Sequence, residues 1–369
     1  MQVFYIAEIN LPNKSAYAQH VFKMCDAFAS NYNVHLFVLS KEKKFSFQKI
    51  KNEYLLKNNF IIIPYKDKKI NVSFINRLKF SFFVKNKIVI NEKKKIILSR
   101  SLFASFLLTF SNCFNFLEIH NNFRSLSYYV FKILYYFFNS QKIYFILIHK
   151  NLKKVLGINK KYIILDDAVE LQDYKKKYIP RVDFDFTYVG SLYPGKGVEI
   201  INYLSKKLPG SKFHIFGNLE TLNDRSFGFN KIKNLIFHGH IPYKKVPKIL
   251  AKSRILLMPY LNRVTVKSNN LDVSKFMSPL KLFDYLASGK AIIASNLPVY
   301  NHILKDGYNC LLVDPNNYDD WIAKIQLLNN NKILYKNISN NARDTAKKFT
   351  WSNRSRKVIK LYKKYITKI

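Results

Sequence analysis

Cysteine is scarce in this sequence. Only three cysteines occur, Cys25, Cys113 and Cys310, and they lie far apart along 369 residues. This spacing excludes a disulfide framework and the paired cysteines of a structural zinc site. Each lies in an apolar stretch, so we expect three small core residues, as is usual in a reducing cytosol.

Long hydrophobic runs are also missing. The first residues, MQVFYIAEIN, lack the basic leader and apolar run of a signal peptide. No stretch reaches about 18 uninterrupted apolar residues, so we predict no membrane-spanning helix. No Asp-x-Asp triplet follows a predicted strand either. The acidic pair in Leu165–Asp167 lies at the expected link between domains, where we interpret it as structural.

Acidic residues are few. Asp and Glu number 23 against 62 Lys and Arg, of which ten are arginine, and the formal net charge is +39. Such an excess is typical of proteins that bind nucleic acids, acidic lipid headgroups or phosphorylated substrates. The chain is also rich in Lys, Asn, Ile, Phe and Tyr, a bias that an A/T-rich coding sequence produces on every solvated face. The sequence leaves both origins open.

Strand-like and helix-like segments alternate along the chain, which predicts parallel βα units. The length of 369 residues and a hydrophobic content of 48% accommodate two domains. A polar segment around Pro180 marks the seam between them. We predict a first domain over residues 1–170, a second over 171–351, and a basic amphipathic helix over 352–369 that joins the first. The expected strands are residues 3–9, 34–40, 60–65, 95–100, 114–120, 143–149, 161–167, 186–191, 213–218, 235–240, 255–260, 291–295 and 310–315.

The segment YVGSLYPGKGVEII (residues 188–201) is typical of a strand, a glycine-rich loop and a helix start. Its glycines permit a close approach of the backbone to a ligand, and the helix start offers free N–H groups. Lys196 adds a positive charge suited to phosphate. The segment is neither a Walker A motif nor a GxGxxG fingerprint. An ordinary strand–loop–helix connection is the alternative.

A second helix start, in SPLKLFDYLASGKAIIAS (residues 278–295), also carries a lysine. Pro279 suits the first helical position, and Gly289 suits the residue just past the helix end. Lys281 near the positive end of the helix is unfavourable unless an anion lies there. Asp284 either accepts hydrogen bonds from sugar hydroxyls or only complements the helix dipole.

Taken in order, several segments resemble the nucleotide-sugar domain of GT-B glycosyltransferases of the family 4 type (glycosyl transferases group 1). They are the two segments above with FHIFGN, LIFHGHIPYKKVPKILAKSRILLMPY and LKDGYNCLLVDPNN, and they cover about residues 185–348. The first half is similar in PNKSAYAQHVFKMCDAFAS, ILSRS, LEIHNN and ILDDAVELQDY. The resemblance implies an α/β chain of two Rossmann-like doubly wound domains facing a central cleft.

The resemblance further implies a retaining transfer of a sugar from a nucleotide diphosphate sugar, with no metal and no other cofactor. His120 matches the histidine near the transferred sugar, with a satisfied histidine at a strand end as the alternative. Glu118, two residues earlier, points the same way and either orients His120 or serves structure. The implied site comprises Ser191, Lys196, Gly197, Pro279, Leu280 and Lys281 for the diphosphate, Asp284 for the ribose, Gly217, His240 and Ile241 beside the base, His120 for catalysis, and Ser15 and Ala16 in the N-terminal loop on the acceptor side.

The sequence departs from the family pattern at several of these places. Phe276 stands eight residues before Asp284, where the first acidic residue of a pair is expected, and Asp272 is a candidate substitute. Asp284 itself is one methylene shorter than the usual Glu. Ser191 replaces a basic residue, and Ser15 with Ala16 replaces a glycine pair. These departures leave the donor sugar open and favour, as one alternative, a non-catalytic GT-B partner subunit.

Residues 125–156, SLSYYVFKILYYFFNSQKIYFILIHKNLKKVL, combine aromatic and basic side chains. As a helix, residues 128–138 are apolar nearly all round, with Lys132 interrupting. This helix is either buried in the core or in contact with an acidic membrane surface, where aromatic and basic side chains are favoured.

We therefore predict a cytoplasmic glycosyltransferase of the hexosyltransferase type, with or without peripheral contact to the acidic membrane face. Its acceptor is a glycan or a lipid-linked molecule in the synthesis of lipopolysaccharide, capsule or exopolysaccharide. A basic nucleic-acid-binding protein is a further alternative. The sequence shows no helix-turn-helix, zinc finger or RNP-type aromatic motif, so nucleic acid is not the expected partner.

Overall fold

Two compact units make up the chain. The computed structural model describes residues 1–40, 45–66, 73–90, 94–123, 125–138, 142–175, 182–222, 232–266 and 271–366. Unit 1 consists of residues 1–167 and 351–369, and unit 2 of residues 168–350. The sequence-based boundaries were 170/171 and 351/352. Of the seam expected around Pro180, over residues 169–185, residues 176–181 lie outside the described residues.

Unit 1 is built on a sheet of seven parallel strands in the order β3-β2-β1-β4-β5-β6-β7. The strands are β1 (Gln2–Leu11), β2 (Asn33–Ser40), β3 (Ile61–Lys66), β4 (Lys95–Ser99), β5 (Asn115–Ile119), β6 (Ile143–Leu147) and β7 (Tyr162–Ile164). β5 and β6 are buried along their whole length. A parallel sheet covered by helices on both faces demands this, and it explains why these strands are continuous apolar runs.

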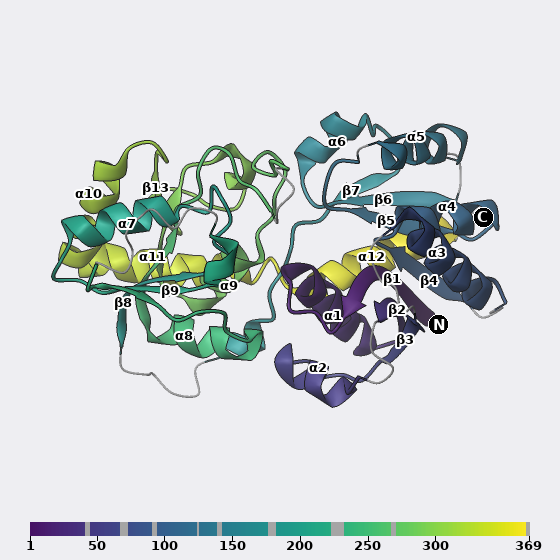
Figure 1. Ribbon diagram of the computed structural model, residues 1–369, viewed down its shortest axis with the longest axis horizontal. Coiled ribbons are helices and arrows are strands. Elements are labelled where there is room, and N and C mark those ends of the chain that lie inside the picture. The colour runs from purple at the N-terminus through teal and green to yellow at the C-terminus, as the bar shows by residue number, and fades with distance from the viewer. Residues whose placement is uncertain are drawn as a thin grey trace. The chain divides into compact units, whose positions relative to one another are not determined.

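Helices connect the strands of unit 1: α1 (Ala16–Ala29), α2 (Phe47–Glu53), α3 (Phe74–Val89), α4 (Leu102–Phe110), α5 (Leu126–Phe138) and α6 (Lys150–Leu156). The last helix, α12 (Trp351–Ile366), returns from the end of the chain and packs against α1 (Figure 1). Ser15 and Ser101 are N-caps whose hydroxyls accept the N–H of the residue three positions on. Because crossovers between parallel strands are right-handed, α1 and α2 cover one face of the sheet and α3 to α6 the other.

Unit 2 holds six parallel strands in the order β10-β9-β8-β11-β12-β13. The strands are β8 (Phe184–Val189), β9 (Phe213–Phe216), β10 (Leu235–Phe237), β11 (Ser253–Met258), β12 (Ala291–Ser295) and β13 (Leu311–Val313). The helices are α7 (Val198–Lys207), α8 (Val246–Lys252), α9 (Leu280–Ser288), α10 (Tyr318–Asn330) and α11 (Lys332–Ala346). The strand order reverses between β8 and β11. In doubly wound sheets, ligands bind where the carboxyl ends of two such strands diverge.

Two doubly wound α/β units confirm the predicted fold class. Three helices were not predicted from the sequence patterns: α2 and α3, which lie in the Lys-rich region before β4, and α4. Cys25 and Cys310 are buried as expected, but Cys113 is only half-buried. Pro279 is the N-cap of α9, so the helix begins one residue later than predicted, at Leu280. Among the residues described, no helix is long and apolar enough to cross a membrane.

Candidate functional site

The loop after β8 lies against the backbone that follows β11. Gly197 has φ +82°, and a Cβ atom there would lie 1.6 Å from the carbonyl oxygen of Pro259. A Cβ atom at Gly195 would lie 1.8 Å from the carbonyl oxygen of Arg263. Only glycine fits either position. Gly197 is the N-cap of α7 and has no side chain to satisfy the first N–H groups of the helix, so those that the carboxylate of Glu199 does not accept are available to a ligand.

Two lysines converge at this switch point. The Nζ atom of Lys196 lies 4.7 Å from the ring centre of Tyr260. The Nζ atom of Lys281 lies 3.6 Å from the ring centre of Tyr188 and 5.1 Å from that of Tyr260. Within the described parts of the chain, the buried Lys281 ammonium has no hydrogen-bond partner. A Cβ atom at Gly190, the residue after β8, would lie 2.5 Å from it, and the φ of +149° at Gly190 is one that other residues rarely adopt.

Burial makes both charges costly. It lowers the pKa of Lys196 to about 8. It also holds the pKa of Lys281 well below its usual range, and the neighbouring charge of Lys196 lowers it further. The tyrosine rings offset part of the cost through cation–π attraction. Two like charges held together beside a helix start are most stable when an anion lies between them.

Asp284 is buried inside unit 2. Its carboxylate accepts hydrogen bonds from the hydroxyls of Tyr174 (2.7 Å) and Tyr243 (3.3 Å). Tyr174 lies in the short 3-10 helix η1 (Leu171–Tyr174) and Tyr243 in η4 (Tyr243–Lys245). The carboxylate therefore holds two connecting segments to α9, a structural task that the sequence did not indicate. Its contact with a ribose stays a prediction.

The other residues expected around the donor lie near these lysines or on neighbouring strand ends. The carbonyl oxygen of Ser191 accepts from Tyr188, 2.7 Å away. A Cβ atom at Gly217 would lie 2.3 Å from the carbonyl oxygen of Gly190, so the ends of β8 and β9 meet closely. His240 and Ile241 lie between β10 and η4, the first exposed and the second half-buried. Their roles beside a base are still predictions.

The position of the missing acidic residue and its candidate substitute, Asp272, both have structural surroundings. Phe276 is buried. Asp272 accepts the backbone N–H groups of Val264 (3.2 Å) and Ser274 (2.9 Å), and so ties together the loop in which it lies. These hydrogen bonds lower the pKa of Asp272 in spite of its partial burial, and the carboxylate already has a structural role.

In unit 1, Glu118 is the centre of a buried polar cluster. One carboxylate oxygen accepts from Tyr5, at 2.8 Å. The other accepts from Arg354 of α12 and from the Nε2 of His120, the latter at 3.0 Å, and also lies 3.0 Å from the Nε2 of His20. Glu118 thus contacts His120, and it also holds Tyr5 and Arg354, so its role in orienting His120 stays a prediction. On the other side of its ring, His20 hydrogen-bonds to Asp167.

The charges in this cluster fix the state of His120. Burial would raise the pKa of Glu118, but His20, Arg354 and the hydrogen bond from His120 hold it well below its usual range. Burial lowers the pKa of His120 to about 3, and the charge of Arg100 lowers it further. His120 is therefore neutral at pH 7. Because its Nε2 faces a carboxylate, that nitrogen carries the proton and Nδ1 is left as an acceptor.

Several members of the cluster were not predicted. His20, on α1, lies in an apolar helical pattern that indicates only core. Asp167 was interpreted as part of a structural link, and its hydrogen bond with His20 was not expected. Arg354 is one of many basic residues in the C-terminal tail, and no local pattern distinguishes it. Its guanidinium also donates to the carbonyl oxygens of Leu165 (2.8 Å) and Asp166 (3.1 Å).

His20, His120 and Asp167 place one ligand atom each within 4.8 Å of the other two. The surroundings do not suit a metal ion, however. Asp167 is hydrogen-bonded to His20, the ring of His120 donates to Glu118, and the positive charge of Arg354 lies on the same carboxylate. The donor atoms are thus engaged with one another beside a fixed cation.

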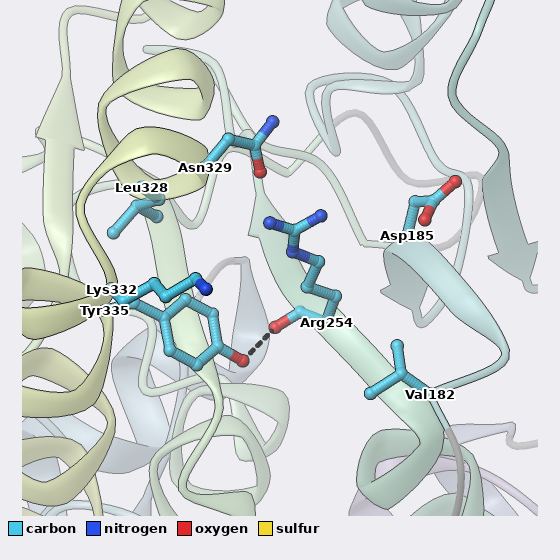
Figure 2. Close-up of a pocket in the computed structure, with 7 residues that line it drawn as sticks. All are labelled: Val182, Asp185, Arg254, Leu328, Asn329, Lys332 and Tyr335. Atoms are coloured by element: carbon cyan, nitrogen blue, oxygen red, sulfur yellow. Dashed lines mark hydrogen bonds between the residues drawn. The ribbon is translucent and has the colours of Figure 1, made fainter.

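The hollow in Figure 2 lies at a different edge of unit 2. Its volume is about 420 Å³, and the hydroxyl of Tyr335 donates to the carbonyl oxygen of Arg254 across 2.7 Å. Asp185 and Arg254 belong to the first residues of β8 and β11, so this hollow lies at the amino ends of the strands. The two lysines follow the carboxyl ends, where doubly wound sheets bind ligands, and we do not assign the hollow to a donor.

Known proteins are similar to part of this chain in sequence and to the whole chain in fold. Residues 171–345 match the family described as Glycosyl transferases group 1. The match covers nearly all of unit 2. An uncharacterized glycosyltransferase of Methanocaldococcus jannaschii is 28% identical over 195 residues, which are 49% of this chain and 48% of that protein. A UDP-Gal:alpha-D-GlcNAc-diphosphoundecaprenol alpha-1,3-galactosyltransferase of Escherichia coli is 26% identical over 179 residues, 45% of this chain and 42% of that protein.

The chain thus spans less than half the length of these two group 1 relatives. The structural likeness extends further. HepE of Anabaena, solved in complex with UDP and glucose, superposes with a TM-score of 0.70 at 11% identity, covering 98% of this chain and 99% of that chain. At this identity the match shows the fold, which is GT-B, as the sequence resemblance implied.

Proposed function

We propose that the chain is a retaining glycosyltransferase that moves a sugar from a nucleotide diphosphate sugar to a glycan or lipid-linked acceptor. One observation carries the proposal: the buried ammonium groups of Lys196 and Lys281 converge on Tyr260 at the starts of α7 and α9. A diphosphate between them would favour the protonated form of both lysines and accept hydrogen bonds from the free N–H groups at the start of α7.

The chemistry of glycosyl transfer fits these groups. The transition state resembles an oxocarbenium ion, and the departing diphosphate gains negative charge as the bond to the sugar breaks. Fixed positive charges in a water-poor site stabilise that developing charge more than they stabilise the ground state. Lys196, Lys281 and the start of α7 supply this stabilisation in our proposal, without a metal ion.

His120 has a complementary part in the proposal. Its neutral ring, held by Glu118, presents Nδ1 as an acceptor for a hydroxyl of the transferred sugar. A neutral acceptor is suitable beside an oxocarbenium-like centre, because an imidazolium would repel the positive charge that develops there.

The relatives guide the choice of substrates. HepE is solved with UDP and glucose, and the galactosyltransferase of Escherichia coli acts, by its name, from UDP-Gal on a diphosphoundecaprenol acceptor. We propose a UDP-sugar donor and a lipid-linked acceptor in cell-surface polysaccharide synthesis. Such an acceptor would place the enzyme at the cytoplasmic face of a membrane.

Nucleotide binding is the first test. We expect UDP to raise the melting temperature of the protein more than GDP, ADP or a short oligonucleotide. Lys196→Met and Lys281→Met should each weaken UDP binding about 10- to 100-fold, since each removes a charge-assisted contact. Lys206→Met, at the exposed end of α7, is the matched control and should bind like the wild type. Stabilisation by the oligonucleotide alone would overturn the proposal and favour a nucleic-acid-binding protein.

A second candidate, a non-catalytic partner subunit, has one observation in its favour, the buried Phe276 in place of an acidic residue. Incubation of the UDP-bound protein with radiolabelled UDP-sugars distinguishes the two. Release or transfer of the sugar, undiminished by EDTA and with the anomeric configuration kept by NMR, supports a metal-independent retaining enzyme. Nucleotide binding without any sugar release favours the subunit.

A further inference from the structure

Exposed apolar side chains are unevenly distributed over the molecule. Of the 21 large apolar side chains that are exposed among the described residues, 16 belong to unit 1, and 12 of those lie on α3, α4, α5 or the residue that caps α3. Unit 2 exposes only five in its described part. Monomeric soluble proteins rarely gather exposed apolar residues in one region unless the region binds something.

The three helices present one continuous surface. α3 packs against α4, and α4 against α5, on the same face of the sheet (Figure 1). Ile75, Lys79 and Phe82 follow one another at helical spacing along the exposed side of α3. Tyr129, Ile133 and Tyr136 do the same on α5, and Phe137 beside them is 77% exposed. We call this surface the α3–α5 face.

The inner sides of the same helices belong to the core. Phe131, Leu134 and Tyr135 of α5 are buried, as are Phe80, Val84 and Ile88 of α3. The expectation that residues 128–138 are either a core helix or a surface helix therefore has a combined answer. Both sides of α5 are therefore largely apolar, and only one of them is buried against the core.

Lysines accompany these apolar side chains on α3 and α5, and no acidic residue lies on either helix. Residues 73–142 hold eleven Lys or Arg and only two acidic residues, Glu92 and Glu118. Glu118 is buried, and Glu92 lies outside the described residues. Lys79 and Lys87 of α3 are exposed. On α5, the Nζ of Lys132 lies 5.3 Å and 5.4 Å from the ring centres of Tyr128 and Tyr136.

We propose that the α3–α5 face binds the surface of an anionic lipid bilayer. Aromatic rings interleaved with lysines suit the headgroup region, where the rings enter the boundary with the acyl chains and the ammonium groups meet lipid phosphates. A second copy of the chain is a poor occupant, because two such basic faces would repel each other. The inference deepens the proposed function, since a lipid-linked acceptor lies in that bilayer, but the binding itself needs neither donor nor transfer.

Vesicle binding of the full-length protein tests the proposal. We expect sedimentation with vesicles of equal parts phosphatidylglycerol and phosphatidylcholine, and at least tenfold weaker binding to phosphatidylcholine alone. The double variant Tyr136→Ser, Phe137→Ser should bind the anionic vesicles at least tenfold more weakly. Lys79→Gln with Lys87→Gln should weaken binding by about fivefold per lysine. The matched control is Leu327→Ser with Ile333→Ser, two exposed apolar residues of unit 2 that should bind like the wild type.

Three results would overturn the proposal: equal binding to both kinds of vesicle, unchanged binding by the Tyr136, Phe137 variant, or no vesicle binding at all. If vesicle binding is absent and light scattering shows a dimer that the same variant dissociates, the face is an interface between copies. Urea unfolding followed by fluorescence of the buried Trp351, in a Trp321→Phe background, reports whether unit 1 of each variant is folded. If the wild-type protein binds anionic vesicles but does not bind UDP, the proposed function is contradicted and the membrane inference stands.

Discussion

Replacing the buried Lys196 by methionine should stabilise the protein in the absence of nucleotide. The side chain is 7% exposed, and burial lowers its pKa to about 8 from an ordinary 10.5. Each unit of pKa corresponds to about 1.4 kcal/mol, so holding this lysine charged costs on the order of 3 kcal/mol of folding free energy. Lys196→Met removes that cost, keeps most of the aliphatic packing and forfeits a cation–π contact worth about 0.5 to 2 kcal/mol. The expected net gain is about 1 to 3 kcal/mol at pH 7.

The pH dependence gives this prediction a second signature. Between about pH 8 and pH 10.5 the unfolded chain binds more protons at this lysine than the folded chain does, so the wild type gains stability as the pH rises. The difference in the free energy of unfolding between Lys196→Met and wild type should therefore be largest below about pH 8 and should disappear by about pH 10.5.

The chain offers a selective probe for this measurement. It holds two tryptophans, the buried Trp321 in unit 2 and the buried Trp351 in unit 1. In a Trp351→Phe background, urea unfolding followed by tryptophan fluorescence reports unit 2. Lys206→Met, on the exposed end of α7, should change the free energy of unfolding by less than about 0.5 kcal/mol. A Lys196→Met protein that is less stable than wild type at pH 7, or a gap that persists at pH 10.5, would refute the reasoning.

Three further predictions concern the buried cluster of unit 1 and the loop after β8. Arg354→Met leaves the Glu118 carboxylate buried without its main cation and should destabilise unit 1 by about 3 to 5 kcal/mol, read from Trp351 fluorescence in a Trp321→Phe background; Arg356→Met, exposed on the same helix, should change stability little. His120 has a pKa of about 3 when folded against an ordinary 6.5, so the unfolded state binds more protons between these values and the stability of unit 1 should fall as the pH falls from about 6.5 toward 3; urea unfolding at pH 4 and pH 7 should show this slope, and His120→Asn should flatten it. Gly197→Ala forces a Cβ atom to within 1.6 Å of a backbone oxygen at φ +82° and should destabilise unit 2 by at least about 2 kcal/mol, whereas Gly210→Ala, with nothing within 4 Å, should not, as thermal unfolding of the pair would reveal.

The strands of both sheets were predictable because parallel sheets bury both faces. Segments such as β6 and β12 are short continuous apolar runs with a turn signal at each end, and no helical pattern competes with them. α3 and α4 were not assigned for the opposite reason. The outward side of α3 carries Phe and Ile beside Lys, and α4 (LFASFLLTF) contains no charged residue, so the polar face that marks an ordinary surface helix is missing from both.

The lysines were predictable and their surroundings were not. Lys196 and Lys281 follow helix-start signals in the local sequence, and the structure brings them to one switch point. The local sequence predicts only that Tyr188 and Tyr260 are core residues, because it does not indicate that an ammonium group lies over their rings. The links of Glu118 to Arg354 and of His20 to Asp167 join residues 236 and 147 positions apart, beyond the reach of any local pattern.

The return of α12 to unit 1 sets an order of assembly during synthesis. Unit 2 is contiguous, so a ribosome has delivered its whole sheet before it makes Arg354. Until then, Glu118 lacks the guanidinium that neutralises it, and α1 lacks the helix that covers it. The first half of the polypeptide to be translated is therefore the last to reach its native state, and a nascent chain halted before residue 351 carries a complete unit 2 beside an unfinished unit 1.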